Sequence, residues 1–211
     1  RTTGTPVFGW TETPDAQTDV PKEWTAKTQP IPNKPPPFDL HGITENDLID
    51  FTPELRAEAL EAVKGYRLGP IFTPPSMITP TNKGTLVVPG LGGGANWPGG
   101  AADPETGFVY VGSTTSPSAV GLNANDRGAQ AANATCCDTD YTMGGSLPNV
   151  RGLRLLKPPY GRITAYDMNK GEIAWQIPNG DTPPAVKNNP PLKGLTIART
   201  GSATQAGLLV T

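Results

Sequence analysis

The stretch from Tyr160 to Gly180, YGRITAYDMNKGEIAWQIPNG, has the pattern of a β-hairpin. Its middle supplies turn residues, among which Gly171 suits a positive φ and the Asp167 side chain can cap the turn. After the turn, apolar residues alternate along a second strand: Ile173, Trp175 and Ile177. Because the turn fixes the register, we expect these three side chains to share one face of the sheet.

The same pattern of turn residues followed by an apolar strand recurs in weaker form elsewhere in the chain. Residues 103–111, DPETGFVYV, again place Asp, then Gly four residues on, then an apolar strand. A third copy, RTTGTPVF over residues 1–8, begins already inside the turn. One hairpin cannot bury its own face, so these copies indicate stacked sheets.

Two of these motifs carry a family resemblance. The pattern AxDxxxGxxxW from Ala165 to Trp175 resembles the tryptophan-docking repeat of the pyrroloquinoline quinone (PQQ) dehydrogenases, whose eight four-stranded blades form a propeller. The sequence GGANWPGGA over residues 93–101, followed by DPETGFVYV, is a second and more specific match. The segments GTPVF (4–8) and KPPPF (34–38) are similar to the membrane-bound glucose dehydrogenase branch in particular.

The resemblance implies an all-β fold, a partial β-propeller of the eight-bladed quinoprotein type with one short helical insertion. A blade needs about 40–50 residues, so the 211 residues correspond to about three blades within one domain, 1–211. A long loop plus the helical insertion would occupy residues 9–68. Because the chain starts in mid-turn and ends in a strand pattern, we expect an internal fragment, which would leave open sheet edges if it folded alone.

Local signals place the remaining elements. Thr52 as N-cap, Pro53 at the first helical position and apolar residues at helical spacing predict a helix that ends at Gly65. Strand signals occur at 69–73, 84–89, 108–113 and 196–211, and residues 115–149 read as a long loop. From Gly9 to Asp39 the chain is rich in Pro and Thr, but its embedded Trp10 and Trp24 favour an ordered excursion pinned to the surface.

Composition excludes some classes of protein. The formal net charge is −2 and the Lys and Arg residues are scattered, which gives no indication of nucleic-acid binding. No run of 18 apolar residues predicts a transmembrane helix. No signal peptide is recognisable, although a fragment cannot report on export.

The pair Asn96 and Trp97 is the predicted cofactor-binding site. Glycines on both sides let the backbone approach a ligand closely, and an amide can both donate and accept hydrogen bonds. In the dehydrogenases that the motif resembles, this Asn lies at PQQ and the following Trp contributes nearby. The alternative from the residues alone is an ordinary glycine turn with Trp97 packed between blades.

Other candidate residues have structural interpretations. Trp175 is expected to stack between adjacent blades. His41 is expected to be a loop residue, because no Ser or Cys nucleophile motif accompanies it for which it could act as general base. The acidic loop residues Asp126, Asp138 and Asp140 lack EF-hand spacing, so a solvated loop is favoured over a calcium site. The adjacent residues Cys136 and Cys137 leave three alternatives open: free thiols, partners for other cysteines, or a vicinal disulfide. No metal ligand set and no catalytic residue is predicted within the chain.

The resemblance implies a periplasmic enzyme, attached to the membrane through another segment, that oxidises a glucose-like sugar or an alcohol with PQQ and a calcium or magnesium ion. Ubiquinone or a cytochrome would accept the electrons, and the remaining blades of the parent chain would be its structural partners. The first alternative is a non-catalytic propeller scaffold related to the outer-membrane assembly lipoproteins. A second is a sugar-binding surface on the segment that carries Trp10 and Trp24.

Overall fold

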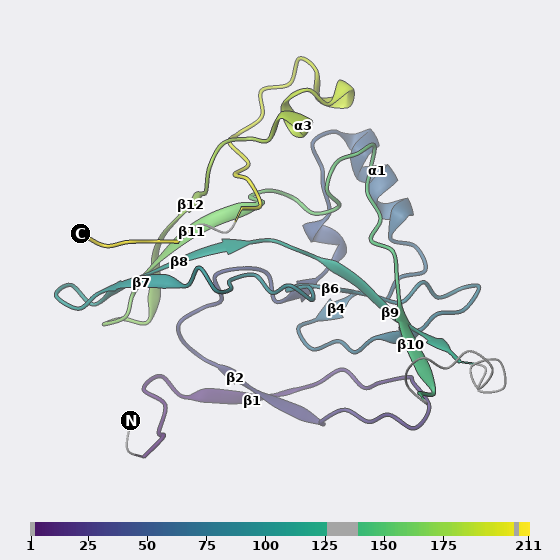
Figure 1. Ribbon diagram of the computed structural model, residues 1–211, viewed down its shortest axis with the longest axis horizontal. Coiled ribbons are helices and arrows are strands. Elements are labelled where there is room, and N and C mark those ends of the chain that lie inside the picture. Colours follow the sequence, from purple (N-terminus) through teal and green to yellow (C-terminus); the bar gives the residue numbers. More distant parts are fainter. Residues whose placement is uncertain (1–2, 126–138, 205–206) are drawn as a thin grey trace.

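A four-stranded antiparallel sheet contains the stretch from Tyr160 to Gly180 in the computed structural model, which describes residues 3–125, 139–204 and 207–211. Its strands in spatial order are β12 (Glu172–Pro178), β11 (Gly161–Asp167), β8 (Phe108–Thr114) and β7 (Gly100–Asp103). Two hairpins, β7–β8 and β11–β12, therefore lie side by side through β8 and β11 (Figure 1).

Both hairpins turn with the same chemistry, as predicted. The Asp167 carboxylate accepts the Asn169 N–H at 3.0 Å, and Gly171 has φ 66°. In the other turn the Asp103 carboxylate accepts the Glu105 N–H at 3.0 Å, and the following glycine also has a positive φ. The left-handed conformation at Gly171 disfavours a residue with a Cβ, which explains the glycine in both copies.

The prediction that Ile173 shares a face with Trp175 and Ile177 is wrong. A bulge shifts the register between β11 and β12, so that Ala165 pairs with Trp175 while its neighbour Tyr166 pairs with Ile173. Directly opposed residues of an antiparallel pair point to the same face, so Ile173 lies on the face opposite to Trp175. An inserted residue reverses the alternation, and the hydrophobic pattern alone does not reveal it.

A second sheet is built around β9 (Ser118–Ala124). Two strands pair with it antiparallel, β10 (Tyr141–Gly144) and β6 (Thr85–Val87), and β5 (Ser76–Met77) pairs with it in parallel. The expectation of a continuous loop over 115–149 is therefore wrong. The sequence SAVGLNA has few β-branched or aromatic residues, and β9 forms because three partners satisfy its backbone. Figure 1 shows β8 leading into β9, which joins the two sheets.

The N-terminal excursion is ordered and contains a ribbon that the sequence pattern did not predict. Strand β1 (Trp10–Pro14) pairs antiparallel with β2 (Thr28–Pro32), and both are largely exposed. Further along, β3 (Gly42–Ile43) pairs with β4 (Gly69–Pro70) around the short helix η1 (Glu45–Asp47) and α1 (Pro53–Ala62). The helix prediction is confirmed, since Thr52 accepts the Leu55 N–H at 3.2 Å as N-cap.

Two terminal strand predictions are wrong. In the described residues 3–9 no strand forms, and Phe8 instead packs against Gly171 of the β11–β12 turn. No strand forms in the described part of 196–211 either; the short helices α3 (Pro184–Lys187) and η2 (Pro190–Leu192) precede that segment. Strands dominate the described chain and α1 is its one long helix, which confirms the all-β class with a helical insertion.

The hydrophobic core lies beside the four-stranded sheet rather than on its face. It joins α1 and the segment before it to residues 150–160 and to α3, through Ile43, Leu48, Ile49, Leu55, Ala59, Val63, Leu86, Val88, Val150, Leu153, Leu155, Leu156, Tyr160, Val186 and Leu192. On the sheet itself, Trp175 stays 41% exposed and contacts Tyr110 with ring centroids 5.9 Å apart. Stacking of Trp175 against an adjacent blade therefore stays a prediction.

Candidate cofactor site

One end of the four-stranded sheet is open, whereas the two tight turns close the other. Thr114 ends β8 and pairs with Gly161 at the start of β11, whereas Gly100, the first residue of β7, pairs with Val111 further along β8. The glycine-rich loop of residues 90–99 enters the sheet at this end. The long crossover of residues 115–160 leaves and re-enters the sheet there as well.

The glycine loop is anchored at its base. The Gly90 N–H donates to the Ser116 carbonyl at 2.8 Å, and the Gly94 carbonyl accepts the Thr114 N–H at 2.8 Å. At Gly100, a Cβ would lie 2.5 Å from the Tyr110 carbonyl, so the close approach to β8 requires a glycine. The loop is thus fixed to the start of the crossover.

Asn96 and Trp97 sit at the exposed tip of this loop. The Asn96 amide donates to the Gly92 carbonyl at 3.1 Å, and its oxygen accepts the Trp97 N–H at 2.8 Å. The Trp97 side chain is 97% exposed. Packing of Trp97 between blades, the alternative interpretation, does not occur within the described residues.

These features fit a flat polar ligand such as PQQ. The internal hydrogen bonds hold Asn96 in one orientation, and its amide still has one N–H to donate. A Cβ at Gly92 would meet no atom within 4 Å, which leaves open space above the loop. An uncovered indole beside these groups supplies the flat apolar surface that a planar ring stacks upon.

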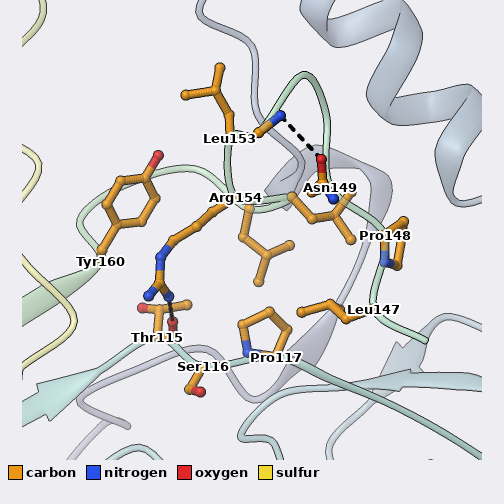
Figure 2. Close-up of a pocket in the computed structure, with 12 residues that line it drawn as sticks. Thr115, Ser116, Pro117, Leu147, Pro148, Asn149, Leu153, Arg154 and Tyr160 are labelled. Atoms are coloured by element: carbon orange, nitrogen blue, oxygen red, sulfur yellow. Dashed lines mark hydrogen bonds between the residues drawn. The ribbon is translucent and has the colours of Figure 1, made fainter. Parts of the chain in front are cut away.

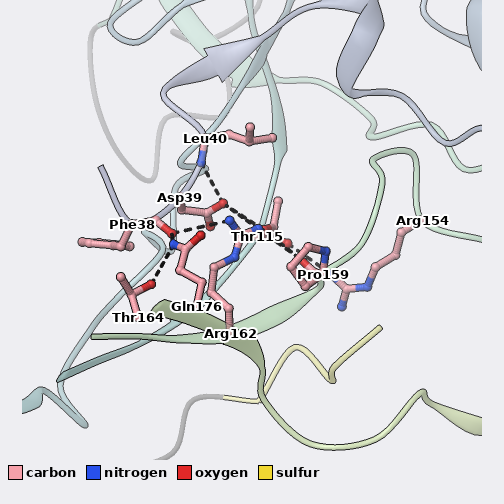
Figure 3. A network of polar contacts seen from close by, with 9 residues as sticks. All are labelled: Phe38, Asp39, Leu40, Thr115, Arg154, Pro159, Arg162, Thr164 and Gln176. Carbon is pink, nitrogen blue, oxygen red and sulfur yellow. Dashed lines mark hydrogen bonds and ion pairs between the residues drawn. The ribbon is translucent and has the colours of Figure 1, made fainter. Parts of the chain in front are cut away.

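A buried ion pair lies behind the loop (Figure 3), and sequence reasoning missed it. Asp39 Oδ1 lies 3.2 Å from Arg162 Nη2, with side chains 2% and 12% exposed. The same oxygen accepts the Thr115 hydroxyl at 2.9 Å, and a Cβ on Gly94 would lie 3.6 Å from Asp39 Oδ2. Among the described residues Asp39 Oδ2 has no hydrogen-bond partner. The KPPPFD segment is thereby tied to the sheet and to the base of the glycine loop.

The network extends along the sheet edge. Arg162 Nη2 also donates to the Thr115 hydroxyl at 2.7 Å and to the Pro159 carbonyl at 3.1 Å. Gln176 of β12 donates to the Phe38 carbonyl at 3.1 Å and to the Thr164 hydroxyl at 2.8 Å. Both strands of the β11–β12 hairpin therefore hold the segment around Asp39. Sequence distance hides these contacts, because Asp39 and Arg162 come from opposite halves of the chain.

The other candidate residues do not gather here. His41 is in a loop, as expected, and burial lowers the pKa of its imidazole while Asp39 opposes that shift. Asp140 pairs with Lys22 at 3.3 Å, whereas Asp126 and Asp138 lie outside the described residues. Cys136 and Cys137 also lie outside them. Within the described ranges no three His, Cys, Asp or Glu residues are placed to hold a metal ion.

The chain belongs to a known family of quinoproteins. Residues 1–211 match the family model described as PQQ, the β-propeller domain of glucose/ethanol/alcohol dehydrogenases. The family assignment confirms the resemblance and, with the observed strands, the partial β-propeller fold. The roles of Asn96 and Trp97 as cofactor ligands stay predictions.

The individual relatives are named as dehydrogenases, and two of the names specify a quinone. The chain is 28% identical over 196 residues to the quinate/shikimate dehydrogenase (quinone) of Acinetobacter baylyi, covering 85% of this chain and 23% of that protein. It is 28% identical to the probable quinate dehydrogenase (quinone) of Xanthomonas campestris pv. juglandis, over 99% of this chain and 28% of that protein. For the glycerol dehydrogenase large subunit of Gluconobacter oxydans the identity is 24%, over 85% and 27%.

The chain thus spans about a quarter of the length of the curated relatives it matches. No solved structure matches it. None of the helices in the described ranges is long and apolar enough to span a bilayer.

Proposed function

We propose that this chain is part of a PQQ-dependent dehydrogenase that oxidises a hydroxyl-bearing carbon of a sugar or alcohol, and that Asn96 and Trp97 contact the cofactor. The observation that carries the proposal is the glycine loop: an anchored base, an oriented amide and a fully exposed indole. Family membership supports the cofactor. The relatives are dehydrogenases named for quinate, shikimate and glycerol, and these names extend the proposed substrate class from glucose-like sugars to polyols and cyclic hydroxy acids.

PQQ, when bound, supplies the two-electron acceptor for the substrate carbon. The task of this chain is to hold and orient it. Trp97 would cover one face of the ring, and the free Asn96 N–H would donate to a quinone or carboxylate oxygen. Asp39 and Arg162 would keep the loop that carries both residues in place. The catalytic base and the calcium or magnesium ion would come from other parts of the parent protein.

The wider setting is also proposed. Ubiquinone or a cytochrome would accept the electrons, and the parent protein would work in the periplasm, with attachment to the membrane through a segment outside this chain. The propeller would be completed by the remaining blades of the parent chain, with about three blades, including the insertion over 9–68, coming from residues 1–211.

The decisive experiment uses the full-length protein that contains this chain. It is reconstituted with PQQ and calcium, and dye-linked turnover is measured with aldoses, polyols, simple alcohols and cyclic hydroxy acids. Asn96→Ala should weaken PQQ binding by about tenfold, the effect of one hydrogen bond to a charged group. The matched control Asn188→Ala, at an exposed helix C-cap, should bind PQQ like the unchanged protein.

The outcomes distinguish a PQQ-dependent enzyme from a non-catalytic scaffold. Quinone-dependent turnover with weakened PQQ binding in Asn96→Ala supports the enzyme and the role of Asn96. Turnover with unchanged PQQ affinity in that variant would remove Asn96 from the site. A folded full-length protein that neither binds PQQ nor turns over any of these substrates would favour the non-catalytic scaffold.

A further inference from the structure

A cavity of about 460 Å³ lies beside the base of the glycine loop. Thr115, Ser116 and Pro117 form one wall, at the start of the crossover that anchors Gly90. The other walls come from residues 147–156 and Tyr160. A volume of this order suits a small organic molecule. The cavity therefore opens from the same end of the sheet as the Asn96 loop.

The one charged side chain that lines this cavity is a cation, Arg154. Arg154 stands with its guanidinium carbon 5.4 Å from the centroid of the Tyr160 ring, which fixes the plane of the cation (Figure 2). Within the described residues its one side-chain hydrogen bond is a long one, 3.4 Å from Nη1 to the Thr115 carbonyl, and no carboxylate there pairs with it. No Asp or Glu lines the cavity.

Tyr160 and Asn149 also line the cavity. Tyr160 is 1% exposed, and its hydroxyl is buried without a hydrogen-bond partner in the described chain, so this hydroxyl does not reach the cavity. The Asn149 oxygen accepts the Gly152 N–H at 3.1 Å, which leaves its NH2 group able to donate. Burial raises the pKa of the Tyr160 hydroxyl, with Arg154 opposing, so it stays protonated at neutral pH.

The remaining lining is apolar and would contact a carbon skeleton: Pro117, Leu147, Pro148, Leu153, Leu155 and Leu156. A planar cation with free N–H groups matches a carboxylate in charge and geometry. We propose that this cavity binds a small organic carboxylate, with the anion on Arg154, the amide of Asn149 as a further donor, and the carbon body against the leucines and prolines.

The direct test measures binding of two matched probes to the full-length protein without PQQ, by titration calorimetry. Cyclohexanecarboxylate carries the anion, and cyclohexanemethanol is its neutral counterpart. We expect the carboxylate to bind at least about tenfold more tightly, as a charge-assisted hydrogen bond requires. Equal affinities, or no binding of either probe, would refute the proposal without any variant, and would leave the PQQ proposal standing.

Variants then assign the anion to its residue. Arg154→Gln should reduce affinity for cyclohexanecarboxylate by roughly ten- to a hundredfold and leave that for cyclohexanemethanol nearly unchanged. Arg199→Gln, at an exposed arginine outside the cavity lining, is the control and should change neither. Equal carboxylate affinity in the two variants would overturn the role of Arg154.

Two ligands could supply the carboxylate that binds in this cavity: a separate organic acid, or PQQ through its own carboxylates. Repeating the titration with PQQ-loaded protein distinguishes them. Retained binding of cyclohexanecarboxylate, with PQQ affinity unchanged in Arg154→Gln, assigns the cavity to a separate acid. Loss of the probe on loading, with weakened PQQ affinity in Arg154→Gln, assigns it to the cofactor.

Discussion

The two ends of the four-stranded sheet are held together in different ways. At the turn end, each hairpin is closed by local contacts, and the turns touch: the Met168 N–H donates to the Gly107 carbonyl at 3.0 Å, and Asn169 donates to the Thr106 carbonyl at 2.9 Å. At the open end, the Asp39–Arg162 pair joins segments far apart in the chain. Local sequence therefore builds one end, and long-range packing builds the end that carries the candidate sites.

The largest expected effect is at the open end. Arg162→Ala should destabilise the full-length protein by about 3–5 kcal/mol, because it leaves the Asp39 carboxylate buried without its cation. The control is Glu172→Gln at the turn end, which breaks an exposed pair with Lys34 and should cost less than about 1 kcal/mol. Denaturant unfolding gives both values. Similar losses in the two variants would show that the ion pair does not hold the open end.

The turn end should be sensitive to its glycines. Gly171→Ala places a Cβ at φ 66° and 2.7 Å from the Phe8 ring, so we expect a loss of about 1–3 kcal/mol. Gly92→Ala, in the open loop, meets no atom within 4 Å and should leave the free energy of unfolding nearly unchanged. If Gly92→Ala proved the more damaging of the two, the loop would be packed against a segment of the parent protein.

Two tryptophans sharpen the contrast between packing and binding. Trp97→Ala should reduce PQQ affinity by about tenfold through lost stacking, and leave thermal stability almost unchanged because the side chain is 97% exposed. Trp175→Ala should do the reverse, since Trp175 packs on Tyr110 within the sheet. Thermal melts and PQQ titrations of both variants test this directly. A Trp97→Ala protein that melts early and binds PQQ normally would assign Trp97 to packing against another blade.

Sequence reasoning succeeded where neighbouring residues determine structure. The turns at Asp103 and Asp167 and the capped helix at Thr52 depend on contacts within a few residues, and all three are confirmed. The bulge in β12, opposite Ala165 and Tyr166, and the strand β9 were missed, because partner strands and not local pattern create them. Hydrophobic alternation cannot signal an inserted residue.

The candidate sites divide in the same way. The Asn96–Trp97 motif could be selected from sequence because its residues are contiguous and resemble a family signature. The Asp39–Arg162 pair and the Arg154–Tyr160 contact could not. An arginine in the sequence carries no sign of whether its partner is a distant carboxylate, an aromatic ring or solvent. Only the fold distinguishes Arg162, which pairs with Asp39, from Arg154, which has no carboxylate partner among the described residues.

The smallest expected effect concerns pH at the turn end. The Thr106 hydroxyl lowers the pKa of the Asp103 carboxyl below its ordinary 3.8, and the Lys170 side chain does the same for Asp167. A carboxyl with a lowered pKa in the folded state stabilises the fold above the ordinary pKa, and this contribution is lost as pH falls through the folded value. From about pH 5 downward, the melting temperature of the unchanged protein should therefore fall more steeply than that of the double variant Asp103→Asn/Asp167→Asn. Because Asn keeps the acceptor oxygen and removes only the charge, the turns themselves should persist.

Glu12→Gln, on the exposed strand β1 outside this sheet, controls for general charge effects. Parallel curves for the double variant and the unchanged protein would mean that the turn carboxylates act through hydrogen bonds alone, without a contribution from their charge.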